Sequence, residues 1–381
     1  MNNTPVRRSV HAYFMQRALE LAREGWYTAR PNPRVGCVIV ADEAIIGEGW
    51  HIQTGGDHAE RAALADVQQR GGSAQGATAY VTLEPCSHTG RTPPCVDALI
   101  DAGVARVVIG AKDPNPRVNG QGAERLLAAG IDVVTDILAE RCAALNAGFN
   151  QRMTTGRPRV RVKLAMSLDG RTAAANGQSQ WITGEEARRD VHRLRAEAGA
   201  VLVGRGTVQA DDPSLTVRLP GEWPQPMRVV LDSDLEITPS ARMLSLPGET
   251  RIFTLSADTG RARALVQAGA LVERIEVRDG RLDLGAVLDA LGEAEINDVL
   301  VEAGPTLAGA FALAGLVDEY MIYMAPKLIG DAGRGLLQLS GVTALDHAQD
   351  LAIDSIEPIG DDWLVRARPV DRDTVADRVI E

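Results

Sequence analysis

The protein has 381 residues, with 40 Lys and Arg against 51 Asp and Glu, and a formal net charge of −11. The length predicts two domains, and the acidic balance argues against non-specific nucleic-acid binding, which needs a basic surface. No segment approaches the ~20 apolar residues of a membrane span, and the N-terminus lacks the apolar core of a signal peptide. We therefore expect a cytoplasmic protein without a nucleic-acid or membrane partner.

The first 150 residues alternate between helical and strand patterns. Helices are predicted where apolar residues recur every three or four positions, and strands where short runs are rich in β-formers. The predicted helices are 13–23, 58–70, 96–102, 124–129 and 139–152. The predicted strands are 36–40, 43–50, 78–83, 106–110 and 131–134. This order predicts one α/β sandwich domain.

A hinge follows at Thr155-Gly156-Arg157-Pro158. We place the domain boundary there, with a first domain at 1–155 and a second at 156–381. The second part restarts the α/β pattern, with eight predicted strands. These strands are 160–165, 200–203, 227–232, 251–255, 274–277, 298–302, 319–325 and 363–367. The predicted helices are 185–197, 260–268, 284–291 and 306–314.

The strongest functional signal combines His58 and Glu60 with Cys86 and Cys95. One imidazole and two thiolates offer three ligands to zinc, and three protein ligands with an open fourth position are typical of catalytic sites. Such a zinc ion makes a bound water acidic enough to act as hydroxide near neutral pH. Cys95 also lies at a predicted helix start, where free N–H groups favour a thiolate.

Glu60 is the candidate proton shuttle between water and a leaving amine. It lies about 200° from His58 around a regular helix, so the zinc must sit over the helix end if both are to reach it. Two other interpretations stay open. The cysteines could be an ordinary buried pair with a capping histidine, or His88 could complete a closed structural zinc site.

Several motifs of the first domain resemble those of the bacterial bifunctional deaminase–reductases of riboflavin biosynthesis. They are PNPRVG at 31–36, residues 47–51, HAE at 58–60, LEPCSHTGRTPPC at 83–95 and KDPNP at 112–116. The long segment between the cysteines separates this family from cytidine and tRNA deaminases. The resemblance runs from about residue 11 to 368. Arg61 departs from it, because the family usually has an apolar residue there.

The resemblance implies a cytidine-deaminase-like α/β/α fold for the first domain. It also implies the reaction: hydrolytic loss of the 2-amino group from 2,5-diamino-6-ribosylamino-4(3H)-pyrimidinone 5′-phosphate. His58, Cys86 and Cys95 would then hold Zn²⁺, with Glu60 as the catalytic residue. Asn32 and His51 would bind the substrate. From the residues alone, a rigid turn between two prolines is the favoured interpretation of Asn32, and His51 is equally a strand-end histidine.

The second domain contains no Rossmann fingerprint, because Gln209 occupies the place of the third glycine after Gly204 and Gly206. The segment 304–309 has Walker-like glycine spacing but lacks the lysine that follows in an ATP loop. What remains is a strand, a glycine turn and a helix from about Thr306. Such a helix N-terminus can bind a phosphate, and it can equally be a plain β–α connection.

The motifs KLAMSLDGR at 163–171, SQWIT at 179–183, DDP at 211–213 and EAGPTL at 302–307 are similar to the reductase domain of the same family. The resemblance implies a dihydrofolate-reductase-like α/β fold that binds NADPH. The implied reaction reduces the ribosyl group of 5-amino-6-(5-phosphoribosylamino)uracil to ribityl. The implied cofactor residues are Ala165, Trp181, Thr207, Asp211, Ser233, Gly304, Pro305, Thr306, Leu307, Ala308, Gly309 and Ala310.

The resemblance also implies a set of reductase substrate residues, namely Lys163, Ser179, Arg195, Leu215, Arg218 and Glu302. Guanidinium groups suit the 5′-phosphate of the substrate, since their N–H groups match phosphate oxygens. Other interpretations remain: Asp211 could be a turn residue, Arg195 an exposed helix charge and Trp181 a core residue. Hydride transfer also requires a proton, for which Lys163, Asp211 and Glu302 are the candidates.

Two rival functions stay open, one within enzymes and one from a different class. A nucleoside or tRNA deaminase with an unrelated second domain would share the zinc motif, but the acidic charge disfavours it. A ligand-binding protein that keeps zinc without turnover is disfavoured by Glu60. The predicted partner is a small phosphorylated pyrimidine, and the family resemblance implies a homodimer or homotetramer.

Overall fold

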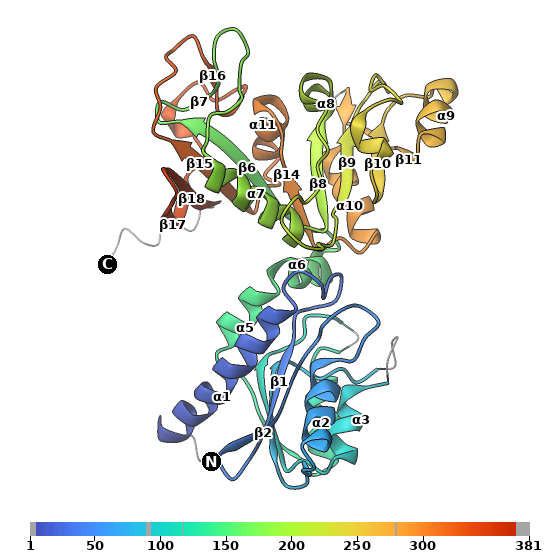
Figure 1. Ribbon diagram of the computed structural model, residues 1–381, viewed down its shortest axis with the longest axis vertical. Helices are drawn as coiled ribbons and strands as arrows, with labels where there is room; N and C mark the ends of the chain where they lie inside the picture. The colour runs from blue at the N-terminus through green and yellow to red at the C-terminus, as the bar shows by residue number, and fades with distance from the viewer. Residues whose placement is uncertain (1–4, 89–92, 117, 279, 371–381) are drawn as a thin grey trace. The chain divides into compact units, whose positions relative to one another are not determined.

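The computed structural model describes residues 5–88, 93–116, 118–278 and 280–370. The chain separates into two compact units, Met1–Arg157 and Pro158–Glu381 (Figure 1). In the described part of the chain, no helix combines the length and apolar character that a membrane span requires.

The first unit is built on a five-stranded sheet in the order β2-β1-β3-β4-β5. Strand β1 pairs antiparallel with both β2 and β3, whereas β3, β4 and β5 run parallel. The strands are β1 (Gly36–Ala41), β2 (Ala44–Trp50), β3 (Thr78–Leu83), β4 (Arg106–Ala111) and β5 (Asp132–Val134). The helices are α1 (Pro5–Glu24), α2 (Ala59–Gln69), α3 (Cys95–Asp101), α4 (Gln121–Ala128), α5 (Ala139–Leu145) and α6 (Ala147–Thr155).

Alternate strand residues build two cores, one on each face of this sheet. Ile39 and Val81 pack on one face against α2, α3 and α4. Val38 and Tyr80 face the other way, against α1 and α5. The period of two in a strand explains this division. Figure 1 shows α1 and α5 on one side of β1 and β2, with α2 and α3 on the other. The result is the expected α/β/α sandwich.

One predicted helix of the first unit is wrong in its continuity. The sequence predicts a single helix over 139–152, but the structure has two helices, α5 and α6, with Asn146 between them. The side chain of Asn146 accepts a hydrogen bond from the backbone N–H of Arg34 and donates one to its carbonyl oxygen. This exchange with a residue 112 positions away competes with a continuous helix, and local periodicity carries no sign of it.

The second unit contains a nine-stranded sheet in the order β11-β10-β9-β8-β14-β6-β15-β18-β17, and Figure 1 shows the strands crossing the domain in this sequence. Only the pairs β15–β18 and β18–β17 of this sheet are antiparallel. The strands are β6 (Arg159–Ser167), β8 (Ala200–Gly204), β9 (Met227–Leu231), β10 (Thr250–Thr254), β11 (Ala270–Arg274), β14 (Asp298–Val301), β15 (Glu319–Ala325), β17 (Leu351–Ile359) and β18 (Asp362–Pro369).

Helices cover both faces of this sheet. They are α7 (Glu185–Glu197), α8 (Arg205–Asp211), α9 (Thr259–Gln267), α10 (Leu284–Glu293) and α11 (Pro305–Leu313). Helices α7 and α9 belong to one core, and α10 and α11 to the other. Four short strands form two small sheets, β7 (Arg171–Ala173) with β16 (Arg334–Gly335) and β12 (Val277–Arg278) with β13 (Arg281–Leu282). Two 3₁₀ turns, Arg242–Ser245 and Leu345–His347, complete the described elements.

Three differences from the predicted elements have physical causes. The strand predicted at 274–277 instead begins at Ala270, because Gly269 ends α9 with a φ of +99° and returns the chain to the sheet at once. Strand β17 was not predicted, because a bulge between Ile353 and Ser355 shifts its alternation by one residue. Helix α8 was not predicted, since it has only seven residues and includes Gly206.

Candidate active sites

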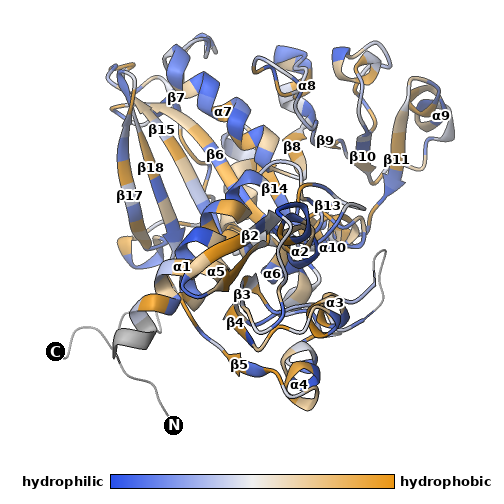
Figure 2. Ribbon diagram, turned by 60° about the horizontal axis from the view of Figure 1, so that its bottom comes forward, coloured by the Kyte–Doolittle hydropathy of each residue, from blue (hydrophilic) through white to orange (hydrophobic). Residues whose placement is uncertain are grey.

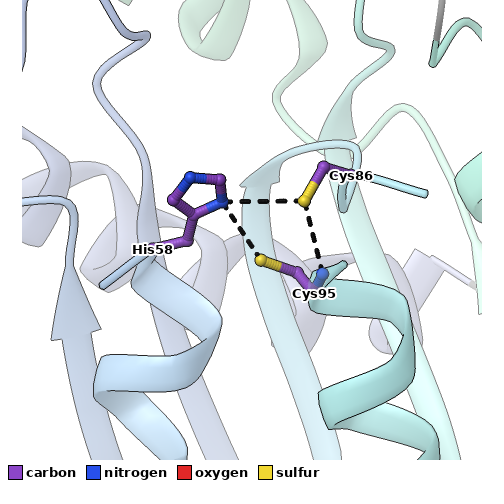
Figure 3. A group of neighbouring side chains, drawn as sticks. All are labelled: His58, Cys86 and Cys95. Atoms are coloured by element: carbon purple, nitrogen blue, oxygen red, sulfur yellow. Dashed lines mark hydrogen bonds between the residues drawn. The ribbon is translucent and has the colours of Figure 1, made fainter. Parts of the chain in front are cut away.

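The first candidate site joins three side chains from the starts of two helices and the end of a strand (Figure 3). His58 is the N-cap residue of α2, Cys95 opens α3, and Cys86 lies three residues after β3. His58 Nδ1 lies 3.2 Å from Cys95 Sγ and 3.6 Å from Cys86 Sγ. The three ligand atoms all lie within 4.8 Å of one another. Both helices start at the same edge of the sheet because β2 and β3, the strands before them, each run antiparallel to β1 and so end at that edge.

This donor set fits zinc. Hydrogen bonds from Cys95 and His58 lower the pKa of Cys86 to about 4, and the backbone N–H of Cys95 also donates to Cys86 Sγ. The neighbouring Cys86 thiolate and burial raise the pKa of Cys95, so the pair by itself carries one charge. A divalent ion favours the thiolate form of both ligands. Among the described residues the cluster holds three protein ligands, and His88 is not one of them. The geometry therefore favours an open catalytic site over a closed structural one.

Glu60 lies beside these ligands in the first turn of α2, and its side chain is 3% exposed. Burial raises its pKa to about 7, and the Cys86 thiolate adds to the effect. A carboxyl group that gains and loses a proton near neutral pH suits a shuttle between water and a leaving amine. The sequence expectation that the metal must lie over the helix end holds, since His58 precedes the first helical residue.

Asn32 and His51 contact each other next to this site. Asn32 Nδ2 donates to His51 Nε2 at 3.0 Å, and His51 Nδ1 donates to the carbonyl oxygen of Asp57 at 2.9 Å. The His51 ring lies 5.3 Å from the His58 ring and is 2% exposed. Burial lowers the pKa of His51, in keeping with a neutral ring of this tautomer. The structure thus brings Asn32 and His51 together next to His58.

The segment between the two cysteines is anchored at both ends, although residues 89–92 lie outside the described residues. Arg61 donates to the carbonyl oxygens of Pro93 and Pro94, at 3.4 and 3.3 Å. Arg125 donates to the carbonyl oxygen of Ser87 at 2.6 Å and pairs with Asp97. Arg61 thus ties α2 to the cysteine segment.

The second candidate site lies in the other unit, around a buried ion pair. Glu302 follows β14, and its carboxylate accepts from Arg195 Nε at 2.6 Å and from Nη2 at 2.8 Å. Arg195 Nη1 donates to the carbonyl oxygen of Thr216. Burial acts to raise the pKa of Glu302, but Arg195 outweighs it and holds that pKa below its usual value. Arg195 is therefore buried and paired, so its interpretation as an exposed helix charge is wrong.

Lys163 lies on β6, next to β14, and its surroundings distinguish the three candidate proton donors. Burial lowers its pKa, although the charge of Glu302 opposes this effect. Its Nζ lies 5.9 Å from the centre of the Tyr323 ring. A lysine with a lowered pKa can give up a proton more readily than an ordinary lysine. Glu302 is held ionised by Arg195, and Asp211 accepts a hydrogen bond from Gln180 at the exposed end of α8.

The remaining substrate candidates lie in two segments. The backbone N–H of Arg218 donates to His192 Nδ1 at 3.3 Å, and Leu215 is 2% exposed with a φ of +54°. His192 and Arg195 on α7 both contact the 215–218 segment, which brings Arg218 close enough to Arg195 for their charges to interact. Ser179 is exposed in the connection between β7 and α7.

The cofactor candidates gather at the carboxyl edge of the parallel strands. Ala165 lies on β6, Thr207 and Asp211 on α8, and Ser233 two residues after β9. Gly304 is the N-cap residue of α11, Pro305 is its first residue, and no side chain caps its free N–H groups. Residues 304–310 thus form a turn and helix start suited to a phosphate. In parallel α/β sheets, ligands bind at this edge.

Trp181 is 64% exposed, so its interpretation as a core residue is wrong. The guanidinium group of Arg188 lies 4.8 Å from the centre of its ring. Lys327 Nζ donates to the carbonyl oxygens of Trp181 and Ile182, at 3.0 and 2.6 Å. Lys327 therefore holds this part of the connection to the end of β15.

Each of the two units matches a known protein family. Residues 158–365 match the model of the RibD C-terminal domain, and residues 8–111 match that of the cytidine and deoxycytidylate deaminase zinc-binding region. The riboflavin biosynthesis protein RibD of Escherichia coli K12 is 49% identical over 362 residues, covering 92% of this chain and 97% of the relative. The chain belongs to the RibD family.

Solved structures agree with this assignment. RibD of Acinetobacter baumannii (form 1) matches with a TM-score of 0.88 and 42% identity, over 96% of this chain and all of that one. A diaminohydroxyphosphoribosylaminopyrimidine deaminase/5-amino-6-(5-phosphoribosylamino)uracil reductase from Thermotoga maritima matches with a TM-score of 0.85 and 36% identity, over the same shares.

The chain is thus a bifunctional deaminase and reductase of riboflavin biosynthesis that acts on small pyrimidine molecules. Its cofactors are Zn²⁺ in the deaminase domain and NADPH in the reductase domain. The predicted α/β fold class of the two domains is confirmed. A nucleoside or tRNA deaminase with an unrelated second domain is excluded, because the second unit matches the model of the RibD C-terminal domain.

Sequence reasoning missed residues that support the sites rather than line them. Lys327 and His192 act through contacts 146 and 26 positions away in the chain, for which no local signal exists. The sequence does hold one signal for Glu84. An acidic residue directly after the buried strand β3 and before Pro85-Cys86 needs hydrogen-bond partners if it is buried.

Proposed function

We propose that the first domain, residues 1–155, removes the 2-amino group of 2,5-diamino-6-ribosylamino-4(3H)-pyrimidinone 5′-phosphate by hydrolysis. The observation that carries this proposal is the buried Glu60 next to the cluster of His58, Cys86 and Cys95. These three side chains would hold zinc, which when bound supplies the Lewis acidity that makes water nucleophilic near neutral pH.

Glu60 moves the protons of this reaction. Its carboxylate takes a proton from the attacking water and delivers it to the departing 2-amino nitrogen, which leaves as ammonia. Asn32 and His51 orient the pyrimidine at the same site. With His51 Nδ1 engaged by the Asp57 carbonyl oxygen, its Nε2 stays an acceptor, and the amide of Asn32 keeps its oxygen and one N–H for the substrate.

We further propose that the second domain, residues 156–381, reduces the ribosyl group of the deaminated product to ribityl. NADPH, when bound, supplies the hydride for C1′. The chain holds it with Ala165, Trp181, Thr207, Asp211, Ser233 and residues 304–310. Lys163 Nζ donates the accompanying proton to the substrate. Its lowered pKa favours it over Glu302, whose carboxylate is kept ionised by Arg195.

The phosphate of the substrate binds next to α7. Arg195 uses three of its N–H groups on Glu302 and Thr216, and a guanidinium has five, so two remain for phosphate oxygens. Arg218 adds a second guanidinium group, and Leu215 and Ser179 complete the substrate contacts. Because Glu302 orients Arg195, it determines where those two N–H groups point.

The test is mass spectrometry of the diaminopyrimidine phosphate after incubation with zinc-loaded protein, without and with NADPH. We expect replacement of one amino group by oxygen without NADPH, and a gain of two hydrogens only with it. Glu60→Gln abolishes the first change and Lys163→Met the second. Unchanged substrate in both tubes with the wild-type protein would refute the proposal, as would full deamination by Glu60→Gln.

We also propose that the chain forms a homo-oligomer through the exposed apolar face of β17 and β18. Leu351, Ile353 and Ile356 are 42%, 60% and 53% exposed, and Trp363 on β18 is 44% exposed. Their register places all four on one face of the two strands, and Figure 2 shows apolar segments alternating with polar ones along both. An apolar face of this kind suits a second copy in a two-fold arrangement. Light scattering should show a dimer or larger assembly for the wild type and a smaller one for Ile356→Asp.

The cytoplasm is the proposed location. The four cysteines are free thiols, and two of them are the proposed zinc ligands. An oxidising compartment would favour their oxidation to a disulfide, whereas the cytoplasm keeps thiols reduced. Cell fractionation with a cytoplasmic marker protein checks this location.

A further inference from the structure

The carboxylate of Glu84 is buried beside the zinc ligands and binds backbone rather than side chains. Glu84 follows the last residue of β3 and is 4% exposed. Its Oε2 accepts from the backbone N–H groups of Asp113 and Gly120, at 3.3 and 3.0 Å. Its Oε1 accepts from those of Gly122 and Ala123, at 3.0 and 3.2 Å. A buried carboxylate needs such donors, and four of them come from one segment.

The four donors lie in the connection from β4 to α4 and in the first turn of α4, and these stretches cannot satisfy the N–H groups by themselves. Gly120 is the N-cap residue of α4 and has no side chain that could cap the helix. Gly122 and Ala123 lie in the first turn of α4, where N–H groups have no partner within the helix. Glu84 therefore caps α4 from a distance, with a negative charge at the positive end of the helix.

The packing between Glu84 and α4 is close. A Cβ on Gly122 would overlap the carbonyl oxygen of Pro85 and lie 3.2 Å from Cγ of Glu84. Pro85 directly precedes the zinc ligand Cys86, so α4 starts against the same stretch of chain that supplies the metal site. The position of the start of α4 therefore depends on the position of Pro85 and Cys86.

The connection from β4 to α4 also brings Asp113 to the site. Asp113 is 6% exposed, and its Oδ1 accepts from the backbone N–H of Asn115 at 2.8 Å. Its carboxyl group lies close enough to Glu84 and Cys86 for both charges to act on it. Because Glu84 holds the backbone of Asp113, it also fixes where the Asp113 carboxyl group lies relative to Cys86.

We infer that Glu84 is a positioning residue for deamination: its carboxylate holds Asp113, Gly120 and the first turn of α4 against Pro85 and Cys86, and so preforms one wall of the pyrimidine site. Glu84 touches neither substrate nor metal in this role. The inference rests on the proposed deamination by the first domain. It predicts that loss of the carboxylate weakens substrate binding more than it weakens zinc binding or turnover.

The test compares Glu84→Gln with the wild type in the full-length, zinc-loaded protein. A glutamine has one acceptor oxygen and turns its NH₂ group toward N–H donors, so the β4–α4 connection loses about half of its anchor. We expect KM for the diaminopyrimidine phosphate to rise about tenfold to a hundredfold, with kcat within threefold. Zinc per chain, measured by mass spectrometry, and the NADPH-dependent rate on the deaminated substrate stay unchanged.

Asp66→Asn is the matched control in the same domain. Asp66 also accepts a backbone N–H, that of Glu48 at 2.8 Å, but it lies away from the zinc ligands on α2. We expect this control to lower stability without moving KM. If Glu84→Gln also lowers only stability, or if it loses zinc, the positioning role is refuted. Wild-type protein that fails to deaminate would instead refute the proposed function.

Gly122→Ala supplies a second variant should Glu84→Gln not fold. Alanine has the higher helix propensity, so only the contact with Pro85 and Glu84 opposes it. We expect the same rise in KM with zinc retained. Faster hydrogen exchange over residues 113–123 in either folded variant should accompany it, and an unchanged KM in Gly122→Ala would contradict the inference.

Discussion

The buried pair between Arg195 and Glu302 permits a quantitative prediction. Their side chains are 11% and 12% exposed, and two N–H···O contacts of 2.6 and 2.8 Å join them. Glu302→Gln removes the carboxylate charge and leaves the guanidinium group unpaired in the interior. Removing one partner of a buried pair costs about 3–5 kcal/mol, a large share of the roughly 5–15 kcal/mol that stabilises a domain. We therefore expect the reductase domain to become marginally stable.

The same helix provides the control. Arg189 pairs with Glu185 at 3.3 Å in an i,i+4 arrangement, with both side chains exposed. Breaking such a pair costs about 0.3–0.5 kcal/mol. Glu185→Gln should therefore leave the unfolding free energy nearly unchanged. Hydrogen exchange at increasing urea concentration, read from peptides of β6 and β14, reports the reductase domain separately from the deaminase domain.

A double-variant cycle and the pH dependence complete the test. Arg195→Met combined with Glu302→Gln should lose less stability than the two single changes together, with a coupling energy of at least about 1.5 kcal/mol. Because Arg195 lowers the pKa of Glu302, the stabilisation is complete above the unfolded-state pKa and disappears as pH falls through the folded-state pKa. A loss below about 1 kcal/mol for Glu302→Gln near pH 7 would refute the reasoning, since exposed pairs account for that much.

Three further predictions concern activity. A chelator that removes zinc should abolish deamination and leave reduction of the deaminated substrate within about twofold, because the ligands belong to the first unit only; parallel assays of both reactions check this. If Lys163 donates the proton, kcat/KM for reduction should fall as pH rises through the lowered pKa of Lys163, which a pH-rate profile measures. In Lys163→Arg the side chain stays charged at every pH of the profile, and we expect the rate of reduction to be about a hundredfold lower. Lys327→Met releases the carbonyl oxygens of Trp181 and Ile182, so KM for NADPH should rise about tenfold in steady-state kinetics, and an unchanged KM would separate that segment from cofactor binding.

The zinc cluster could be predicted from the sequence because its signals are local. His58 and Cys95 stand at helix starts and Cys86 at a strand end, and parallel β–α units bring such positions to one edge of a sheet. Regular α/β alternation predicted most strands of both sheets for the same reason. Spacing alone could not predict which thiol carries the charge, since that depends on hydrogen bonds among the three groups.

The supporting contacts could not be predicted, because they join residues far apart in the chain. Arg195 and Glu302 are 107 positions apart, and only folding shows that a charged residue on a helix is buried against a strand end. The four donors of Glu84 lie 29 to 39 positions away and are backbone groups, which leave no trace in residue type. Strand β17 escaped prediction because a bulge breaks its alternation.

The strand order of the reductase sheet has a consequence for synthesis of the chain. Strand β6 is the first strand of its domain, yet its two neighbours are β14 and β15, which are made more than 130 residues later. At 5–20 residues per second, both edges of β6 wait roughly 7–30 s for their partners on the ribosome. The deaminase domain can fold during this time, because its sheet is complete by Val134. Nascent chains that end before β14 should therefore carry a folded deaminase domain and an unpaired β6, a template for aggregation or for chaperone binding.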